Sequence, residues 1–200
     1  METVGVIGGG QMGSQIAALA AMAGYETHVY DSDSENLKSK IKFTEDNLLN
    51  LIDKGRYEKS KLDNFKEHLH SSESIDETIN KKSFVIEAVV ERLDIKLEIF
   101  ENISKKLDED VVLATNSSFI PASEIAKSCE HPSRFINMHF FYPPIRMDLV
   151  EISYPVETNK ETIERTQTLG KDMGRTVITC KKETPGFIVN RMLAALTDEA

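Results

Sequence analysis

A histidine and a glutamate lie at equal distances from the middle of a turn-like segment, in an arrangement that could support proton transfer. His139 and Glu151 are each six residues from Ile145, and residues 142–144 (Tyr-Pro-Pro) between them are a turn signal. If the flanking segments pair as antiparallel strands about Ile145, the two side chains fall directly opposite each other. A carboxylate beside an imidazole fixes its tautomer, raises its pKa and stabilises the imidazolium formed in proton abstraction. Such a pair is a candidate for proton transfer.

A second polar group follows another apolar run. Residues 116–118 (Asn-Ser-Ser) come directly after Val111–Thr115, where an α/β sheet would place chemistry beyond the carboxyl end of a strand. Each residue type also has an ordinary explanation, because a histidine near aromatic residues can be structural and a serine after a strand can cap a helix. A nucleotide site elsewhere in the sequence helps to decide between these explanations.

That nucleotide site is indicated by a glycine-rich turn. Gly8, Gly10 and Gly13 fit the pattern G-x-G-x-x-G between a β-branched run, Thr3–Ile7, and an apolar helical segment. Gly8 permits the tight turn, Gly10 lets the backbone approach a pyrophosphate, and Gly13 lets the helix pack close to the strand. The phosphates would bind N–H groups at the helix N-terminus.

An acidic residue specifies the nucleotide. The expected second strand, Glu26–Tyr30, ends at Asp31, 18 residues after Gly13. A carboxylate at this place can hold the ribose 2′-hydroxyl and repels a 2′-phosphate. The sequence therefore predicts NAD as the cofactor in preference to NADP. Combined with the polar residues described above, an NAD site favours a dehydrogenase.

Strand-like and helical segments alternate along the chain, which predicts a doubly wound α/β sheet of the Rossmann type. One departure is residues 33–70, a polar, lysine-rich stretch that reads as two helices joined near Gly55 and inserted after the second strand. It is either a solvated hairpin or a flap that meets an anionic substrate. Besides Thr3–Ile7 and Glu26–Tyr30, the expected strands are Ser83–Glu87, Val111–Thr115, Arg134–Phe140, Leu149–Ile152 and Thr176–Cys180.

Composition limits the partners. Hydrophobic residues at 40% and charged residues at 28% are typical of a soluble globular protein, and the net charge of −9 argues against nucleic acid. Cys129 and Cys180 have neither metal-site nor disulfide-framework spacing. No apolar run approaches the roughly 18 residues needed to cross a membrane, and the first strand leaves no room for a signal peptide. We expect a cytoplasmic protein without nucleic-acid, membrane or metal partners.

Six motifs together resemble the L-3-hydroxyacyl-CoA dehydrogenase family, which includes the 3-hydroxybutyryl-CoA dehydrogenases. They match in order over essentially all 200 residues. The motifs are GGGQMG at 8–13, EAVVE at 87–91, NSS at 116–118, HFF at 139–141, LVE at 149–151 and TPGFIVNR at 184–191.

The resemblance implies NAD-dependent interconversion of an L-3-hydroxyacyl-CoA and its 3-oxoacyl-CoA. His139 would take the proton of the 3-hydroxyl, Glu151 would orient His139, and Ser118 and Asn190 would hydrogen-bond the substrate oxygen. The family usually has asparagine, near the nicotinamide, where this chain has Tyr142. The phenol could replace the hydrogen bond of that asparagine, or it could narrow the site and alter substrate choice. The residues implied to bind NAD are Gly8, Gly9, Gly10, Gln11, Met12, Gly13, Asp31, Glu91, Lys96, Ser118 and Tyr142.

The resemblance also assigns the hairpin and the domains. In the family the hairpin contacts coenzyme A, so Lys54 and, more weakly, Asn47 would bind the acyl-CoA substrate together with Ser118. Residues 1–184 would form the NAD-binding Rossmann domain. Residues 185–200 would begin an all-helical C-terminal domain that is largely absent, and a homodimer is expected when that domain is present.

Two other functions stay open. A related dehydrogenase could act on a small hydroxy acid resembling gulonate or carnitine, but such a substrate would give the lysine-rich hairpin nothing to bind. Alternatively, this chain could be an NAD-binding fragment without turnover, because loss of domain closure could remove orders of magnitude in rate.

Overall fold

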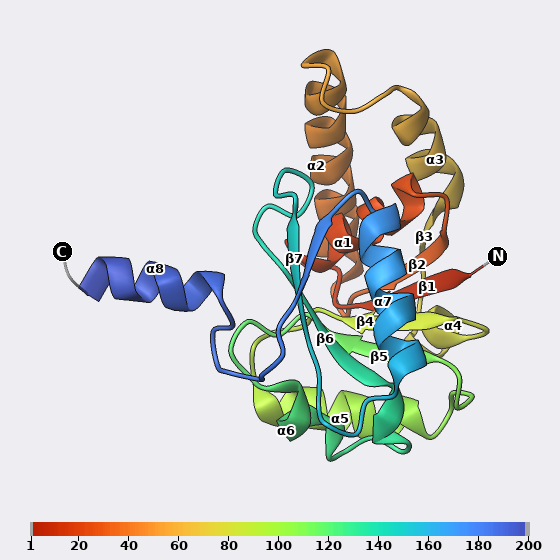
Figure 1. Ribbon diagram of the computed structural model, residues 1–200. Coiled ribbons are helices and arrows are strands. Elements are labelled where there is room, and N and C mark those ends of the chain that lie inside the picture. Colours follow the sequence, from red (N-terminus) through yellow and green to blue (C-terminus); the bar gives the residue numbers. More distant parts are fainter. Residues whose placement is uncertain (1, 199–200) are drawn as a thin grey trace.

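The computed structural model describes residues 2–198 as an α/β fold built around one eight-stranded sheet (Figure 1). The strand order is β3-β2-β1-β4-β5-β6-β7-β8. Neighbouring strands are parallel except β6 and β7, which are antiparallel. The strands are β1 (Thr3–Ile7), β2 (Glu26–Tyr30), β3 (Leu69–Ser71), β4 (Phe84–Glu87), β5 (Val112–Thr115), β6 (Phe135–Phe140), β7 (Leu149–Ser153) and β8 (Thr176–Thr179).

Helices cover both faces of the sheet. Buried residues of α1 and α7 pack on one face, and those of α4, α5 and α6 pack on the other. The pair α2 and α3 packs on the outer side of α1. The helices are α1 (Gly13–Met22), α2 (Ser34–Asp53), α3 (Ser60–His68), α4 (Ile75–Ile79), α5 (Leu93–Ser104), α6 (Ala122–Ala126), α7 (Lys160–Asp172) and α8 (Val189–Asp198), with a 3₁₀ turn at Pro132–Arg134.

The strand order locates the ligand-binding edge. The strand β1 lies between β2 and β4, so the chain winds outward from the centre in both directions. In such sheets, ligands bind where the order reverses, outside the carboxyl ends of the strands. The glycine turn follows β1 at this point, and Gly8 lies there with φ +96°. The predicted Rossmann-type fold is confirmed.

The expected strands agree with the structure to within one residue at each end. The helical hairpin is also confirmed, and Gly55 between its helices has φ +72°. Its predicted end at residue 70 is wrong, because the chain leaves α3 at His68 and enters the short strand β3. A three-residue strand is too short to show the alternation by which strands are recognised in a sequence.

The register of β6 and β7 is the one expected from the turn. His139 pairs directly with Glu151 across the antiparallel ladder, and Phe140 pairs with Val150. Facing residues in such a ladder have side chains on the same face of the sheet, within reach of each other. The prediction that these strands bring His139 and Glu151 together is confirmed.

The tip of the hairpin is fastened to the turn between β6 and β7. The Tyr57 hydroxyl donates to the carbonyl of Ile145 at 2.9 Å, and the guanidinium of Arg56 binds Asp148 at 2.9 Å. Beneath them, the buried Arg175 donates to the Tyr57 hydroxyl and to the carbonyl of Met147. The hairpin is therefore held in a fixed position relative to the strands that carry His139 and Glu151.

The last described helix stands apart from the sheet. Figure 1 shows α8 projecting from the rest of the fold, and none of its described residues is buried. The apolar side chains of Met192, Leu193 and Leu196 are more than half exposed. Within residues 2–198, no helix has both the length and the apolar character that a membrane crossing requires. Residues 1, 199 and 200 of the expected domains lie outside the described residues.

Gly13 provides a test of the close contact between helix and strand. A Cβ at this position would lie 1.7 Å from the carbonyl oxygen of Gly8, and backbone cannot move aside as a side chain can. We expect Gly13→Ala to lower the free energy of unfolding by at least about 2 kcal/mol, measured by denaturant titration. Gly10→Ala is the matched control, because a Cβ there meets nothing within 4 Å. Equal stability of the two variants would contradict this account.

Candidate active site

A cavity of about 650 Å³ lies at the carboxyl edge of the sheet, beside the glycine turn. Its apolar side consists of residues from α4, α5 and the segment after β4. Its polar side includes Asp31, at the end of β2. The predicted cofactor residues that line it are Gly8, Gly10, Gln11, Met12 and Asp31.

The glycine turn has the form that a dinucleotide needs. A Cβ on Gly8 would lie 2.7 Å from the backbone of Ala88, whereas a Cβ on Gly10 would project into open space. Packing within the protein therefore does not require glycine at position 10. A glycine there is expected where a pyrophosphate approaches the backbone. The N–H of Gly9 donates to Asp31 at 2.8 Å, so Asp31 also fixes the turn. The residues fit NAD.

His139 and Glu151 form a buried hydrogen-bonded pair at the carboxyl end of β6. The Nδ1 of His139 lies 3.0 Å from the Oε2 of Glu151, and the two side chains are 4% and 0% exposed. Because the carboxylate accepts, Nδ1 carries the proton and Nε2 keeps its lone pair. The rings of Phe141 and Phe187 pack against the imidazole, with centroids 4.6 Å and 5.2 Å away.

The surroundings of His139 favour its neutral form. Burial lowers the pKa of His139, while the hydrogen bond to Glu151 and the charges of Glu151 and Glu91 raise it; burial prevails, and the pKa lies below its ordinary value of 6.5. The carboxylate raises the pKa of the imidazole as expected, but burial, which the sequence pattern does not show, outweighs it. A neutral imidazole with a free Nε2 can accept a proton at neutral pH.

The serine loop after β5 is arranged around Glu91. One oxygen of Glu91 accepts from the Ser117 hydroxyl at 2.6 Å and from the N–H groups of Ser118 and Phe119 at 2.9 Å and 3.0 Å. Burial raises the pKa of Glu91, but these bonds and the charge of Lys96 outweigh it and lower the pKa below its ordinary value. Glu91 therefore stays ionised and holds the half-buried Ser118 in place.

Lys96 lies in a buried ion network behind this loop. Its Nζ is 2.7 Å from Glu87 and 3.4 Å from Glu91, and the side chain is 1% exposed. The other oxygen of Glu87 accepts from the Thr115 hydroxyl at 2.7 Å. Sequence reasoning gave Glu87 and Thr115 no role. The sequence feature that could have indicated a role for Glu87 is its place at the end of an otherwise apolar strand, Phe84–Glu87.

The predicted coenzyme A residues are only partly brought together. Asn47 lines a smaller cavity of about 220 Å³, together with Phe43, Tyr142 and Arg146, and its amide oxygen accepts from Arg146 at 2.9 Å. Tyr142 lies in this cavity and is not among the residues that line the cavity at the glycine turn. Lys54 is exposed at the end of α2, outside both cavities.

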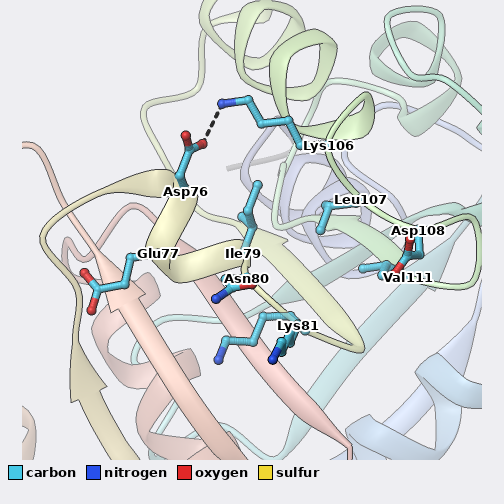
Figure 2. A pocket seen from close by; sticks show the side chains of 10 residues that line it. Asp76, Glu77, Ile79, Asn80, Lys81, Lys106, Leu107, Asp108 and Val111 are labelled. Carbon is cyan, nitrogen blue, oxygen red and sulfur yellow. Dashed lines mark hydrogen bonds and ion pairs between the residues drawn. The ribbon is translucent and has the colours of Figure 1, made fainter.

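Another cavity, of about 560 Å³, lies at the opposite edge of the sheet (Figure 2). It is lined by α4 and by residues that precede β4 and β5. An ion pair between Asp76 and Lys106, 2.6 Å long, joins two of its lining residues. The charges of its three lysines and three acidic residues balance, and no predicted site residue lines it. In the part of the chain that the structure describes, no cluster of His, Cys, Asp and Glu side chains has an arrangement for binding a metal ion.

Comparison with known proteins agrees with this geometry. The family described as "3-hydroxyacyl-CoA dehydrogenase, NAD binding domain" matches residues 3–184. The chain belongs to the 3-hydroxyacyl-CoA dehydrogenase family. It carries the family's NAD-binding domain, and its cofactor is NAD.

Relatives in this family extend over more residues than this chain. The probable 3-hydroxybutyryl-CoA dehydrogenase of Bacillus subtilis (strain 168) is 32% identical over 200 residues, covering 100% of this chain and 69% of that protein. The mitochondrial hydroxyacyl-coenzyme A dehydrogenase of Sus scrofa is 35% identical over 205 residues, covering 100% and 65%. The chain thus spans about two thirds of the length of these relatives.

A solved structure in the family has the same fold. The crystal structure of (S)-3-hydroxybutyryl-CoA dehydrogenase from Ralstonia eutropha superposes with a TM-score of 0.92 and 32% sequence identity. The superposition covers 100% of this chain and 70% of that one.

The charge of Asp31 should set the preference for NADH over NADPH in this dehydrogenase domain. Asp31→Asn keeps one oxygen acceptor for the turn but removes the charge that repels a 2′-phosphate. We expect the affinity ratio of NADH to NADPH, measured by calorimetric titration, to fall about tenfold or more. Asp33→Asn is the control, since the Asp33 side chain caps α2. An unchanged ratio in Asp31→Asn would show that another group selects the nucleotide.

Proposed function

We propose that this chain is the NAD-binding and catalytic-base portion of an enzyme that oxidises an L-3-hydroxyacyl-CoA to its 3-oxoacyl-CoA, or catalyses the reverse reduction. The observation that carries the proposal is the buried His139–Glu151 pair, at the same edge of the sheet as the NAD cavity. Names of the relatives support the acyl-CoA substrate, and the family match supports the cofactor.

In this proposal, His139 is the general base. Its Nε2 takes the proton of the 3-hydroxyl during oxidation and returns it during reduction. Glu151 keeps the proton of the imidazole on Nδ1 and stabilises the imidazolium that forms. Bound NAD supplies the hydride acceptor for C3 of the substrate.

Ser118 and Asn190 are proposed to hydrogen-bond the substrate oxygen on which charge develops. Ser118 is positioned by the bonds from residues 117–119 to Glu91. Asn190 lies in the first turn of α8, directly after two backbone N–H groups that bind Glu151. Glu91 and Lys96 are proposed to support the cofactor site through the buried ion network.

The hairpin is proposed to bind coenzyme A through Lys54, with Asn47 as the weaker contact. Its tip is fixed to the turn between β6 and β7, so a thioester bound along α2 would have a defined direction toward His139. Tyr142 lines the same cavity as Asn47, which supports an effect on substrate choice as one of its two proposed roles.

The domain division and the assembly are also proposals. We infer that residues 1–184 form the NAD-binding domain and that residues 185–200 begin a helical domain. The exposed apolar side chains of α8 support this inference, because such a face is normally covered. A homodimer formed through that domain and a cytoplasmic location complete the proposal.

The base assignment predicts a pH profile and a variant effect. A base works only when unprotonated, and burial lowers the pKa of His139 below 6.5. Therefore kcat/KM for oxidation of L-3-hydroxybutyryl-CoA should stay constant from neutral pH down to below 6.5 and fall at lower pH. Initial rates of NADH formation between about pH 5 and about pH 8 test this. His139→Gln should lower the rate by about 10²-fold to 10⁴-fold.

The control for His139→Gln is NADH binding, which should change less than twofold because the glycine turn is untouched. Glutamine keeps a polar amide in the site but has no nitrogen that can act as a base. Turnover that persists in this variant, or an acid limb near pH 8, would contradict the assignment of His139 as the base.

The hairpin assignment predicts a change in KM. Lys54→Ala should raise KM for acetoacetyl-CoA about threefold to fivefold with little change in kcat, because an exposed charge contact contributes about 1 kcal/mol or less. NADH consumption measures both constants. Lys59→Ala is the matched control, since Lys59 is also exposed on the hairpin. Equal KM values for the two variants would remove Lys54 from the substrate site.

A further inference from the structure

The start of α8 is held on the body of the protein by very few contacts. No described residue of the helix is buried, and Figure 1 shows it directed away from the sheet. Packing of the helix therefore cannot determine where its first turn lies. Its position depends on the turn formed by residues 184–188 immediately before it.

One carboxylate binds both this turn and the catalytic histidine. The Oε1 of Glu151 accepts from the backbone N–H groups of Ile188 and Val189, each at 3.0 Å. The Oε2 of the same side chain lies 3.0 Å from Nδ1 of His139. Glu151 is 0% exposed, so no bulk water competes for either oxygen.

The two bonds from the N–H groups of Ile188 and Val189 to Glu151 form a tether that physical chemistry favours. The first N–H groups of a helix lack partners within the helix, and an anion at the N-terminus is stabilised by the helix dipole. Hydrogen bonds to an ionised acceptor are about twice as strong as neutral ones. Glu151 comes from β7, so its bonds join α8 to the central sheet.

Phe187 reinforces the same junction. Its side chain is 4% exposed and its ring centroid lies 5.2 Å from that of His139. The backbone of Phe187 has φ +48°, which is rare for a residue with a side chain, and Gly186 before it has φ +78°. Strained conformations persist where neighbouring contacts determine them. Here those contacts are the histidine ring and the carboxylate bonds that follow.

We propose that Glu151 is a positioning residue for α8 as well as for His139. One buried carboxylate thereby fixes the position of the base relative to the helix that carries Asn190. The tether itself stands on geometry alone; the catalytic value of placing Asn190 rests on the proposed function. Movement of α8 and a change in the hydrogen bonding of His139 are coupled, because they bind the two oxygens of one carboxylate.

Val189 allows the tether to be cut without touching Glu151 or His139. Val189 is the first residue of α8, where proline fits the helix and lacks only an N–H that has no helical partner. In Val189→Pro, a ring carbon replaces the hydrogen beside the carboxylate and pushes the start of α8 away. Val189→Ala keeps the N–H and is the matched control.

The first measurement is backbone amide exchange. We expect the Ile188 amide to exchange at least about tenfold faster in Val189→Pro than in Val189→Ala. NADH binding that equals the parent's excludes unfolding of the domain. Equal protection of Ile188 in the proline and alanine variants would overturn the tether.

The second measurement follows His139 directly, by nitrogen NMR of its imidazole across pH. A carboxylate relieved of two N–H donors accepts more strongly from His139, and a displaced Phe187 admits water to the ring. Both changes favour the imidazolium, so the pKa of His139 should be higher in Val189→Pro than in Val189→Ala. Glu91 and Cys180, the other titratable groups near the pair, are the same in both variants.

Identical His139 titrations in the two variants would show that the helix and the base are not coupled. Both measurements are independent of turnover. If the parent chain bound NADH but did not reduce acetoacetyl-CoA, the catalytic proposal would fail while the tether remained supported or overturned by exchange and NMR alone. If the parent is active, Val189→Pro should lower kcat/KM relative to Val189→Ala with NADH affinity unchanged.

Discussion

Buried carboxylates at the carboxyl edge of the sheet determine how this site is built. Glu87 and Glu151 are both 0% exposed. Glu87 is the last residue of the apolar strand β4, and Glu151 lies within β7. A charge removed from water costs several kcal/mol unless its lone pairs are all engaged. Glu87 meets this requirement through Lys96 and Thr115, and Glu151 through His139 and the start of α8. Each carboxylate consequently forces its neighbours into one arrangement.

The loops of the site are therefore fixed to one another as well as to their strands. Asp31 binds the amide of Gly9, which joins the end of β2 to the glycine turn. Glu91 binds residues 117–119, which joins the segment after β4 to the serine loop after β5. Loops of this kind would otherwise be the mobile part of an α/β protein. Preorganised donors and acceptors are what a proton and hydride transfer requires, since their reorientation would add to the barrier.

Sequence patterns predicted the parts of this site that depend on local chemistry. The glycine spacing, Asp31 at the end of a strand, and the equal distances of His139 and Glu151 from the turn follow from backbone geometry, and the pairing of the last two is confirmed. Which polar side chains are buried was harder to predict from the sequence. Whether Lys96 faces a cavity or a carboxylate depends on how closely α5 approaches β4, which periodicity does not encode. The bonds from α8 to Glu151 use backbone N–H groups, which every residue except proline has, so no residue type marks them.

Charge raises a separate question, because the chain carries −9 overall while coenzyme A is itself strongly anionic. At physiological salt, charges are screened beyond about 8 Å, so the residues nearest the bound anion matter most. Lys54 and Arg56 at the hairpin tip and Arg146 on the facing turn place positive charge there, and Asp148 engages Arg56. Arg146 also binds Asn47 across the gap between hairpin and turn. The contacts that fix the hairpin therefore also hold Arg56 and Arg146 beside the proposed substrate path, where they would favour the proposed anionic substrate despite the negative charge of the chain.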